Sequence, residues 1–217
     1  MLPEEIEAVL EACEQALRAG GACDLRELGF WRSVAAVKRD HRLIERYADR
    51  IGAIDRLAFE RRVRFRLPIV LGTFGLASGA LLGLGLASTR RDLGVLAGAG
   101  LLLGTTHDLG HLVAGRLVGI EFTWWFLDGP TRVQPGLKTD YATYLRVPPR
   151  SRAAMHAAGA LVTKIVPLAV LPLARHAWAR RVLVAVGLVQ VLTDILFSTR
   201  QSDWKRVRRE LRFRAVS

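Results

Sequence analysis

The pattern of hydrophobic and polar positions divides the chain into two parts. In residues 1–66 apolar side chains recur at helical spacing between charged ones, whereas from residue 67 they form long runs with few charges. The first part contains two amphipathic stripes, formed by Ile6, Val9, Leu10, Cys13 and Leu17 and by Leu43, Ile44, Tyr47, Ile51, Ile54 and Leu57. We therefore predict a cytoplasmic helical segment over residues 1–66.

The second part, residues 67–217, predicts a membrane-embedded core. About 20 consecutive apolar residues suffice to cross the hydrocarbon region of a bilayer, and residues 67–89 contain no charge at all. The four runs of this kind are residues 67–89, 93–118, 153–174 and 182–198. The expected fold is thus mostly α-helical, a polytopic membrane protein with about four transmembrane helices.

Glycines recur at intervals of four residues in the first two apolar runs. They are Gly75, Gly79 and Gly83 in the first run and Gly94 and Gly98 in the second. Small residues at this spacing allow helix backbones to approach closely within a membrane. We expect a tightly packed pair of helices here.

Charge is distributed unevenly between the two parts. Residues 1–66 hold 13 basic and 12 acidic side chains, whereas residues 67–217 hold 19 basic and 8 acidic ones. Basic clusters flank the first and last runs, so we expect an integral protein of a prokaryotic plasma membrane with both termini cytoplasmic. Anionic lipid headgroups explain the basic C-terminal tail more simply than nucleic acid does, and we expect no nucleic-acid partner.

The second apolar run contains the clearest candidate for chemistry, the segment "GTTHDLGHLVAGRLVGI" at residues 104–120. His107 and His111 are four residues apart, so a helix places both imidazoles on one face, as two ligands of one zinc ion require. The alternative is a pair of neutral histidines hydrogen-bonded to neighbouring helices. Polar groups at membrane depth are costly, which favours a functional site. The pattern matches H-E-x-x-H with Asp108 in the glutamate position.

The segment "HDLGHLVAGRLVGI" resembles the motif helix of site-2 proteases, which are intramembrane zinc metalloproteases. The resemblance extends over about residues 67–210. As in that family, a short β-rich stretch is expected next, in "IEFTWWFLDGPTRVQPGLKTDYATYLRVPPRSR". The segment "RAAMHAAGALVTKI" is similar to the family's "R…AGPxxN" helix, with Ala160 and Thr163 replacing the proline and the asparagine. The segment "TDILFSTRQSDWKRV" takes the place of "N…P…LDGGR", but without its glycines.

In the family, the aspartate of that last segment is the third zinc ligand, and three residues here compete for the role. Asp203 aligns best and follows the fourth run, so we favour it. Asp194 is an intramembrane carboxylate nine residues earlier, and Asp128 lies in a literal "LDG" that we expect to be a turn. His156 either faces the metal and stabilises an oxyanion or, as we favour, is a buried hydrogen-bonded histidine.

The resemblance implies a zinc-dependent protease in which His107, His111 and Asp203 hold Zn²⁺ and Asp108 is the general base. Its substrate would be a membrane-embedded segment of another protein, paired as a strand with residues 120–147. Aspartate is one methylene shorter than glutamate, so its carboxylate lies further from the water that it must activate. A misplacement of about 1 Å can lower the rate about a hundredfold. The alternative is therefore a non-proteolytic metal-binding scaffold that binds client transmembrane helices. A histidine-box di-iron site is excluded, because the chain has only 5 histidines.

Overall fold

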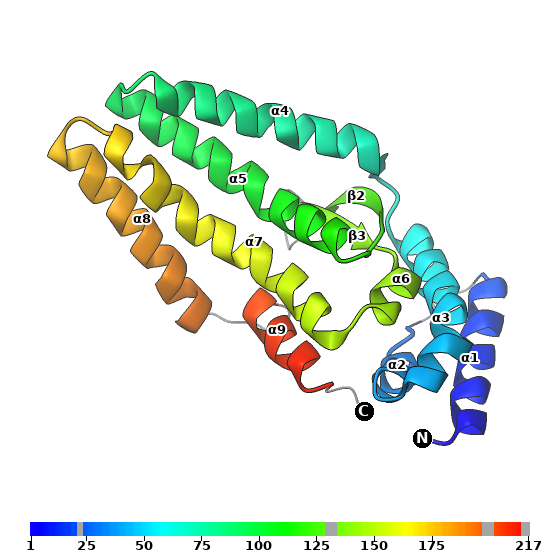
Figure 1. Ribbon diagram of the computed structural model, residues 1–217. Helices are drawn as coiled ribbons and strands as arrows, with labels where there is room; N and C mark the ends of the chain where they lie inside the picture. The colour runs from blue at the N-terminus through cyan, green and yellow to red at the C-terminus, as the bar shows by residue number, and fades with distance from the viewer. Residues whose placement is uncertain (21–23, 129–133, 197–201, 214–217) are drawn as a thin grey trace.

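The computed structural model describes residues 1–20, 24–128, 134–196 and 202–213 of the chain. These residues form a mostly helical structure with one small antiparallel sheet (Figure 1). The expected fold class, mostly α-helical with a short β-rich insertion after the motif helix, is confirmed to this extent. Cys23 lies outside the described residues, and the side chain of Cys13 is buried.

The N-terminal bundle consists of α1 (Pro3–Arg18), α2 (Phe30–Val37) and α3 (His41–Arg62). The start of α1 is fixed by Glu5, whose carboxylate accepts a hydrogen bond from the backbone nitrogen of Leu2 at 2.8 Å. Asp40 caps α3 through the backbone nitrogen of Arg42 at 2.9 Å. The predicted stripes supply most of its core, which includes the buried residues Ile6, Leu10, Cys13, Leu17, Tyr47, Ile51 and Ile54. Leu57 of the second stripe is exposed instead.

Four long helices lie side by side in the second part of the molecule (Figure 1). They are α4 (Ile69–Ser88), α5 (Asp92–Leu117), α7 (Pro149–Val170), which continues into the 3-10 turn η1 (Leu171–Leu173), and α8 (Ala177–Leu196). The tight α4–α5 connection includes Arg90, whose φ is 54°. The short helices α6 (Tyr141–Arg146) and α9 (Asp203–Leu211) lie near the junction with the N-terminal bundle (Figure 1).

Glycines bring α4 and α5 close together, as predicted. A Cβ at Gly98 would overlap the carbonyl oxygen of Gly83, and one at Gly79 would lie 2.8 Å from Cγ2 of Thr105. Gly75 differs, because a Cβ there would meet nothing within 4 Å. The close approach of α4 and α5 therefore involves Gly79, Gly83 and Gly98, but not Gly75.

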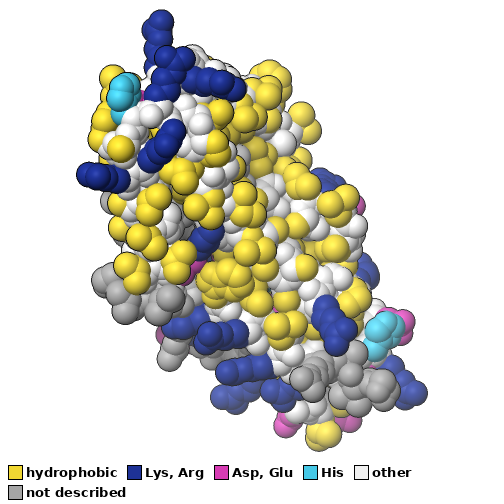
Figure 2. All heavy atoms as spheres, turned by 60° about the vertical axis from the view of Figure 1, so that its left-hand side comes forward, with side chains coloured by type: hydrophobic (Ala, Val, Ile, Leu, Met, Phe, Trp, Pro, Cys, Tyr) yellow, Lys and Arg dark blue, Asp and Glu magenta, His cyan; other side chains and the backbone are white. Residues whose placement is uncertain are grey.

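The membrane character of this part is confirmed only in a coarser form. Within the described residues, two stretches are long and apolar enough to cross a membrane, Ile69–Ser88 and Pro149–Leu173. Figure 2 shows hydrophobic side chains spread over much of one face of the molecule. Helix α5 has sufficient length, but His107 and Asp108 make it more polar, and α8 carries charges at both ends. Two of the four expected spans are thus long and apolar enough to cross a membrane.

The sheet joins the two parts of the chain. Its strands are β1 (Arg66–Pro68), β2 (Phe122–Asp128) and β3 (Gln134–Thr139), in the order β1-β2-β3 with antiparallel pairing. The indole nitrogen of Trp125 in β2 donates to the carbonyl oxygen of Ile69 at 3.1 Å and so fixes the start of α4. The boundary expected after residue 66 therefore falls inside a strand that connects the two parts.

Candidate metal centre

His107, Asp108 and His111 form a cluster on one turn of α5. Their potential ligand atoms all lie within 4.8 Å of one another, and the two imidazole centroids are 4.8 Å apart. This arrangement follows from the helical spacing of the two histidines. The structure thus has the geometry that the sequence motif predicts.

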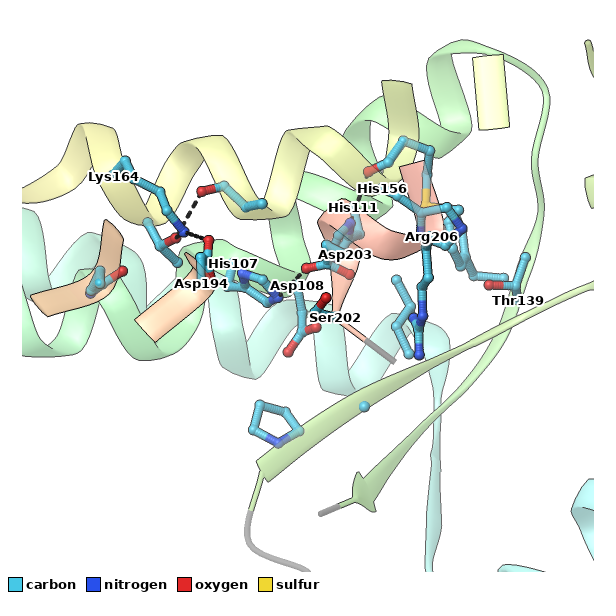
Figure 3. A pocket seen from close by; sticks show the side chains of 18 of the residues that line it. His107, Asp108, His111, Thr139, His156, Lys164, Asp194, Ser202, Asp203 and Arg206 are labelled. Atoms are coloured by element: carbon cyan, nitrogen blue, oxygen red, sulfur yellow. Dashed lines mark hydrogen bonds and ion pairs between the residues drawn. The ribbon is translucent and has the colours of Figure 1, made fainter. Parts of the chain in front are cut away.

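Asp203, the first residue of α9, brings a second carboxylate to the same place. Its Oδ2 lies 3.3 Å from Nε2 of His111 and 3.4 Å from Nε2 of His107 (Figure 3). Burial raises the pKa of Asp203, but the contact with His111 outweighs it and holds the pKa below its usual range. Two imidazole nitrogens and one carboxylate oxygen therefore converge from two helices that are far apart in sequence.

The ring of His111 is oriented by the neighbouring helix α7. Its Nδ1 lies 2.8 Å from the carbonyl oxygen of Met155, so Nδ1–H donates there and Nε2 keeps a free lone pair. Gly159 makes room for this ring, because a Cβ at that position would overlap the imidazole atoms. Metal-binding histidines are commonly fixed in this way through the nitrogen that faces away from the metal.

His107 contributes its Nε2 to this convergence. Its Nδ1 is buried and has no hydrogen-bond partner within the part of the chain that the structure describes. Because a metal at Nε2 would leave Nδ1 unpaired, the fit to a metal depends on the set of donor atoms. Two imidazoles and a carboxylate are also the donor set of catalytic zinc sites, which leave one position open. The residues present therefore fit Zn²⁺, with Asp108 as a further carboxylate beside them.

Asp194 has different partners. Its carboxylate is paired with Lys164 of α7 (Figure 3). It also accepts a hydrogen bond from the indole nitrogen of Trp204 at 2.9 Å. A cation and a donor are what a carboxylate among apolar helices requires. The structure brings Asp203, rather than Asp194, within 4 Å of the two histidines.

The two remaining candidates are placed apart from this convergence. Nε2 of His156 lies 2.9 Å from the hydroxyl of Tyr144, and its ring centroid is 6.3 Å from that of His111. The structure thus has the buried, hydrogen-bonded histidine that we favoured. Asp128 is the last residue of β2, in register with Gln134, but its side chain and the turn expected after it lie outside the described residues.

The cluster opens into a cavity of about 530 Å³. Its walls include α5, α7, α8, α9 and strand β3, which contributes Gly136 and Thr139. Two cations of this cavity, Lys164 and Arg206, were not among the predicted site residues. Arg206 follows Asp203 by three residues, so helical spacing places it on the same face, a signal that was available in the sequence.

Comparison with protein-family models, with curated proteins and with solved structures gives no match to this chain. The likeness to site-2 proteases therefore depends on the residues described above and on their arrangement.

Proposed function

We propose that this protein is a zinc-dependent intramembrane protease that cleaves membrane-embedded segments of other proteins. The observation that carries the proposal is the convergence of His107, His111 and Asp203 in the wall of a cavity between apolar helices. An ordinary structural role would not require two histidines and two carboxylates at this place.

In this proposal His107, His111 and Asp203 hold the metal. Bound zinc supplies Lewis acidity that activates water and polarises a peptide carbonyl. The carboxylate of Asp108 accepts the proton of the attacking water and passes it to the leaving amine. The guanidinium of Arg206 adds positive charge to the cavity, which favours the developing oxyanion.

The surroundings support a membrane-embedded substrate. The outer face of α4 is apolar and exposed, and α7 is the second stretch that is long and apolar enough to cross a membrane. We propose that α5 and α8 complete four spans, with both termini cytoplasmic and the basic tail at anionic headgroups. Strand β3 pairs with β2 on one side and borders the cavity, so an extended substrate segment could add to its other edge.

Asp108 favours a second candidate function. With aspartate in the glutamate position, the base stands further from the water, and proteolysis could be lost while the metal is retained. The protein would then be a metal-binding membrane scaffold that holds client transmembrane helices in the same cavity.

The test compares zinc content and peptide cleavage in purified protein reconstituted with a transmembrane peptide. We expect about one zinc per chain and cleavage by the wild type. Asp108→Asn should retain zinc and lose cleavage by about 10²–10⁴-fold, since it removes the proton acceptor. The control His107→Ala/His111→Ala should lose both.

Full zinc in the double variant would refute the metal centre. Zinc binding without cleavage, with no response of either property to Asp108→Glu, would establish the scaffold instead.

A further inference from the structure

Helix α9, which carries Asp203, has an unusual interior. Within this helix the only buried residue is charged, Glu210, whose exposed fraction is 1%. Four of its nine residues are cationic, Lys205, Arg206, Arg208 and Arg209. Isolated helices shorter than about 12–15 residues are marginal in water, so α9 depends on its contacts. Within α9 no apolar side chain is fully buried, and Trp204 and Val207 are half-buried.

Glu210 is held by two cations from different parts of the chain. Its Oε1 lies 2.6 Å from Nζ of Lys38, and its Oε2 lies 2.7 Å from Nε of Arg152. All three side chains are almost completely buried. Lys38 directly follows α2 in the N-terminal bundle, whereas Arg152 belongs to the first turn of α7. Glu210 therefore ties α9 to both parts of the molecule.

The two cations are themselves fixed. Nη1 of Arg152 donates to the carbonyl oxygens of Leu145 at 3.0 Å and Val147 at 2.8 Å, which connect α6 to α7. Nζ of Lys38 lies over the ring of Tyr144, 4.9 Å from its centroid. Removal of one partner from a buried ion pair leaves a charge without compensation, so breaking either contact of Glu210 is costly.

The geometry of α9 connects this link to the metal centre. Asp203 and Glu210 are seven residues apart, which is about 10.5 Å along a helix axis. One end of α9 is thus fixed by Lys38 and Arg152. The other end presents a carboxylate to His107 and His111 (Figure 3).

We infer that Lys38, Arg152 and Glu210 form a buried clamp that positions α9 so that Asp203 meets the two histidines. The N-terminal bundle then completes the metal centre through Lys38, rather than serving as a passive cap. Lys38, Arg152 and Glu210 are positioning residues, since they act through Asp203. The inference rests on the proposed function in taking zinc as the ligand.

The experiment uses full-length protein in detergent micelles, first freed of metal. Lys38→Met and Glu210→Gln break the clamp while nearly preserving side-chain shape. Arg50→Met is the control for the bundle, because Arg50 pairs with Glu7 and Glu14 away from α9. Arg208→Gln is the control for α9, because it removes an exposed charge from the same helix.

Three quantities are measured for each variant. The first is zinc affinity, by competition with a chromophoric chelator. The second is the visible absorption of bound Co²⁺, which weakens when a four-coordinate site gains water ligands. The third is hydrogen exchange of the α9 amides in the metal-free protein, relative to the α3 amides of the same sample.

We expect Lys38→Met and Glu210→Gln to weaken zinc binding by about 10–100-fold, the range found when a group that orients a ligand is removed. Both should reduce the Co²⁺ absorption and accelerate exchange in α9 but not in α3. The controls Arg50→Met and Arg208→Gln should stay close to the wild type in zinc affinity, Co²⁺ absorption and hydrogen exchange.

Zinc affinity and α9 exchange equal to those of the controls would overturn the clamp. Equal acceleration of α3 and α9 would also overturn it, because it would assign Lys38 and Glu210 to general folding. A wild type that binds no zinc would contradict the proposed function, whereas exchange in the metal-free protein would still decide the clamp.

Discussion

The N-terminal bundle and the long helices distribute their apolar residues in opposite ways. In α1–α3 the apolar side chains are inside, as with the fully buried Ile6 and Leu10. In α4 only Gly83 and Ala87 are buried, and Phe74 and Leu81 are 73% and 69% exposed. A helix whose large side chains point outward is stable only in an apolar environment or against an apolar partner.

Charged groups of the two regions also differ. In the bundle, ion pairs such as Arg50 with Glu7 are partly exposed, and the buried Lys38 is paired with Glu210 of α9. Among the long helices, Asp108, Lys164 and Asp194 line the cavity instead. A charge is expensive in an apolar region, so those retained there mark either a pair, as for Lys164 with Asp194, or chemistry. The charged groups that line the cavity are therefore the first candidates for the proposed chemistry.

The largest effect that tests this contrast is expected at the two aspartates of the cavity. Asp203→Ala should weaken zinc binding by more than about 100-fold, because loss of a ligand exceeds the 10–100-fold typical of an outer group. Asp194→Asn keeps the shape of the side chain and the hydrogen bond from Trp204. It should therefore weaken zinc binding by no more than about 100-fold. Zinc affinity of the purified protein is the measurement.

The reverse order would exchange the roles of the two residues. If zinc survives Asp203→Ala but is lost in Asp194→Asn, then Asp194 is the ligand and its pairing with Lys164 is broken in the metal-bound protein.

A smaller effect compares one leucine from each region. Leu10→Ala should destabilise the bundle by about 2–5 kcal/mol, since Leu10 is fully buried. Leu81→Ala on the outer face of α4 should cost less than about 1 kcal/mol in detergent, because little of that side chain contacts protein. Chemical denaturation in micelles measures both, and a large cost at Leu81 would show that α4 packs against a protein partner rather than lipid.

Local features of the fold could be predicted from the sequence because they depend on periodicity. The stripes of α1 and α3 give their buried faces, and the spacing of His107 and His111 places both imidazoles together. Asp203 was chosen through the resemblance of its segment to the zinc-binding aspartate segment of site-2 proteases, together with its place after the fourth apolar run. These signals all lie within one helix or follow the sequence order of neighbouring elements.

Contacts between distant segments could not be predicted. Lys38 and Glu210 are 172 residues apart, and the pairing of Tyr144 with His156 depends on how α6 turns into α7. The short strand β1 carries no alternating pattern and forms only because β2 lies beside it. The four expected spans were identified from apolar runs, but His107 and Asp108 make α5 more polar, and α8 carries Arg180, Arg181 and Asp194.

The smallest effect is expected from a single methyl group at a glycine. Gly159→Ala places a Cβ against the imidazole of His111, which the hydrogen bond to Met155 holds in its ligand orientation. Alanine is favoured over glycine in a helix by about 1 kcal/mol, so the substitution should not destabilise α7 through its propensity. We expect zinc affinity to fall about tenfold, with His111 displaced.

Gly75→Ala is the matched control, because a Cβ there meets nothing within 4 Å, and its zinc affinity should be unchanged. Equal affinities for the two variants would mean that His111 is free to move without loss of metal, and that the close fit of α7 against α5 serves packing alone.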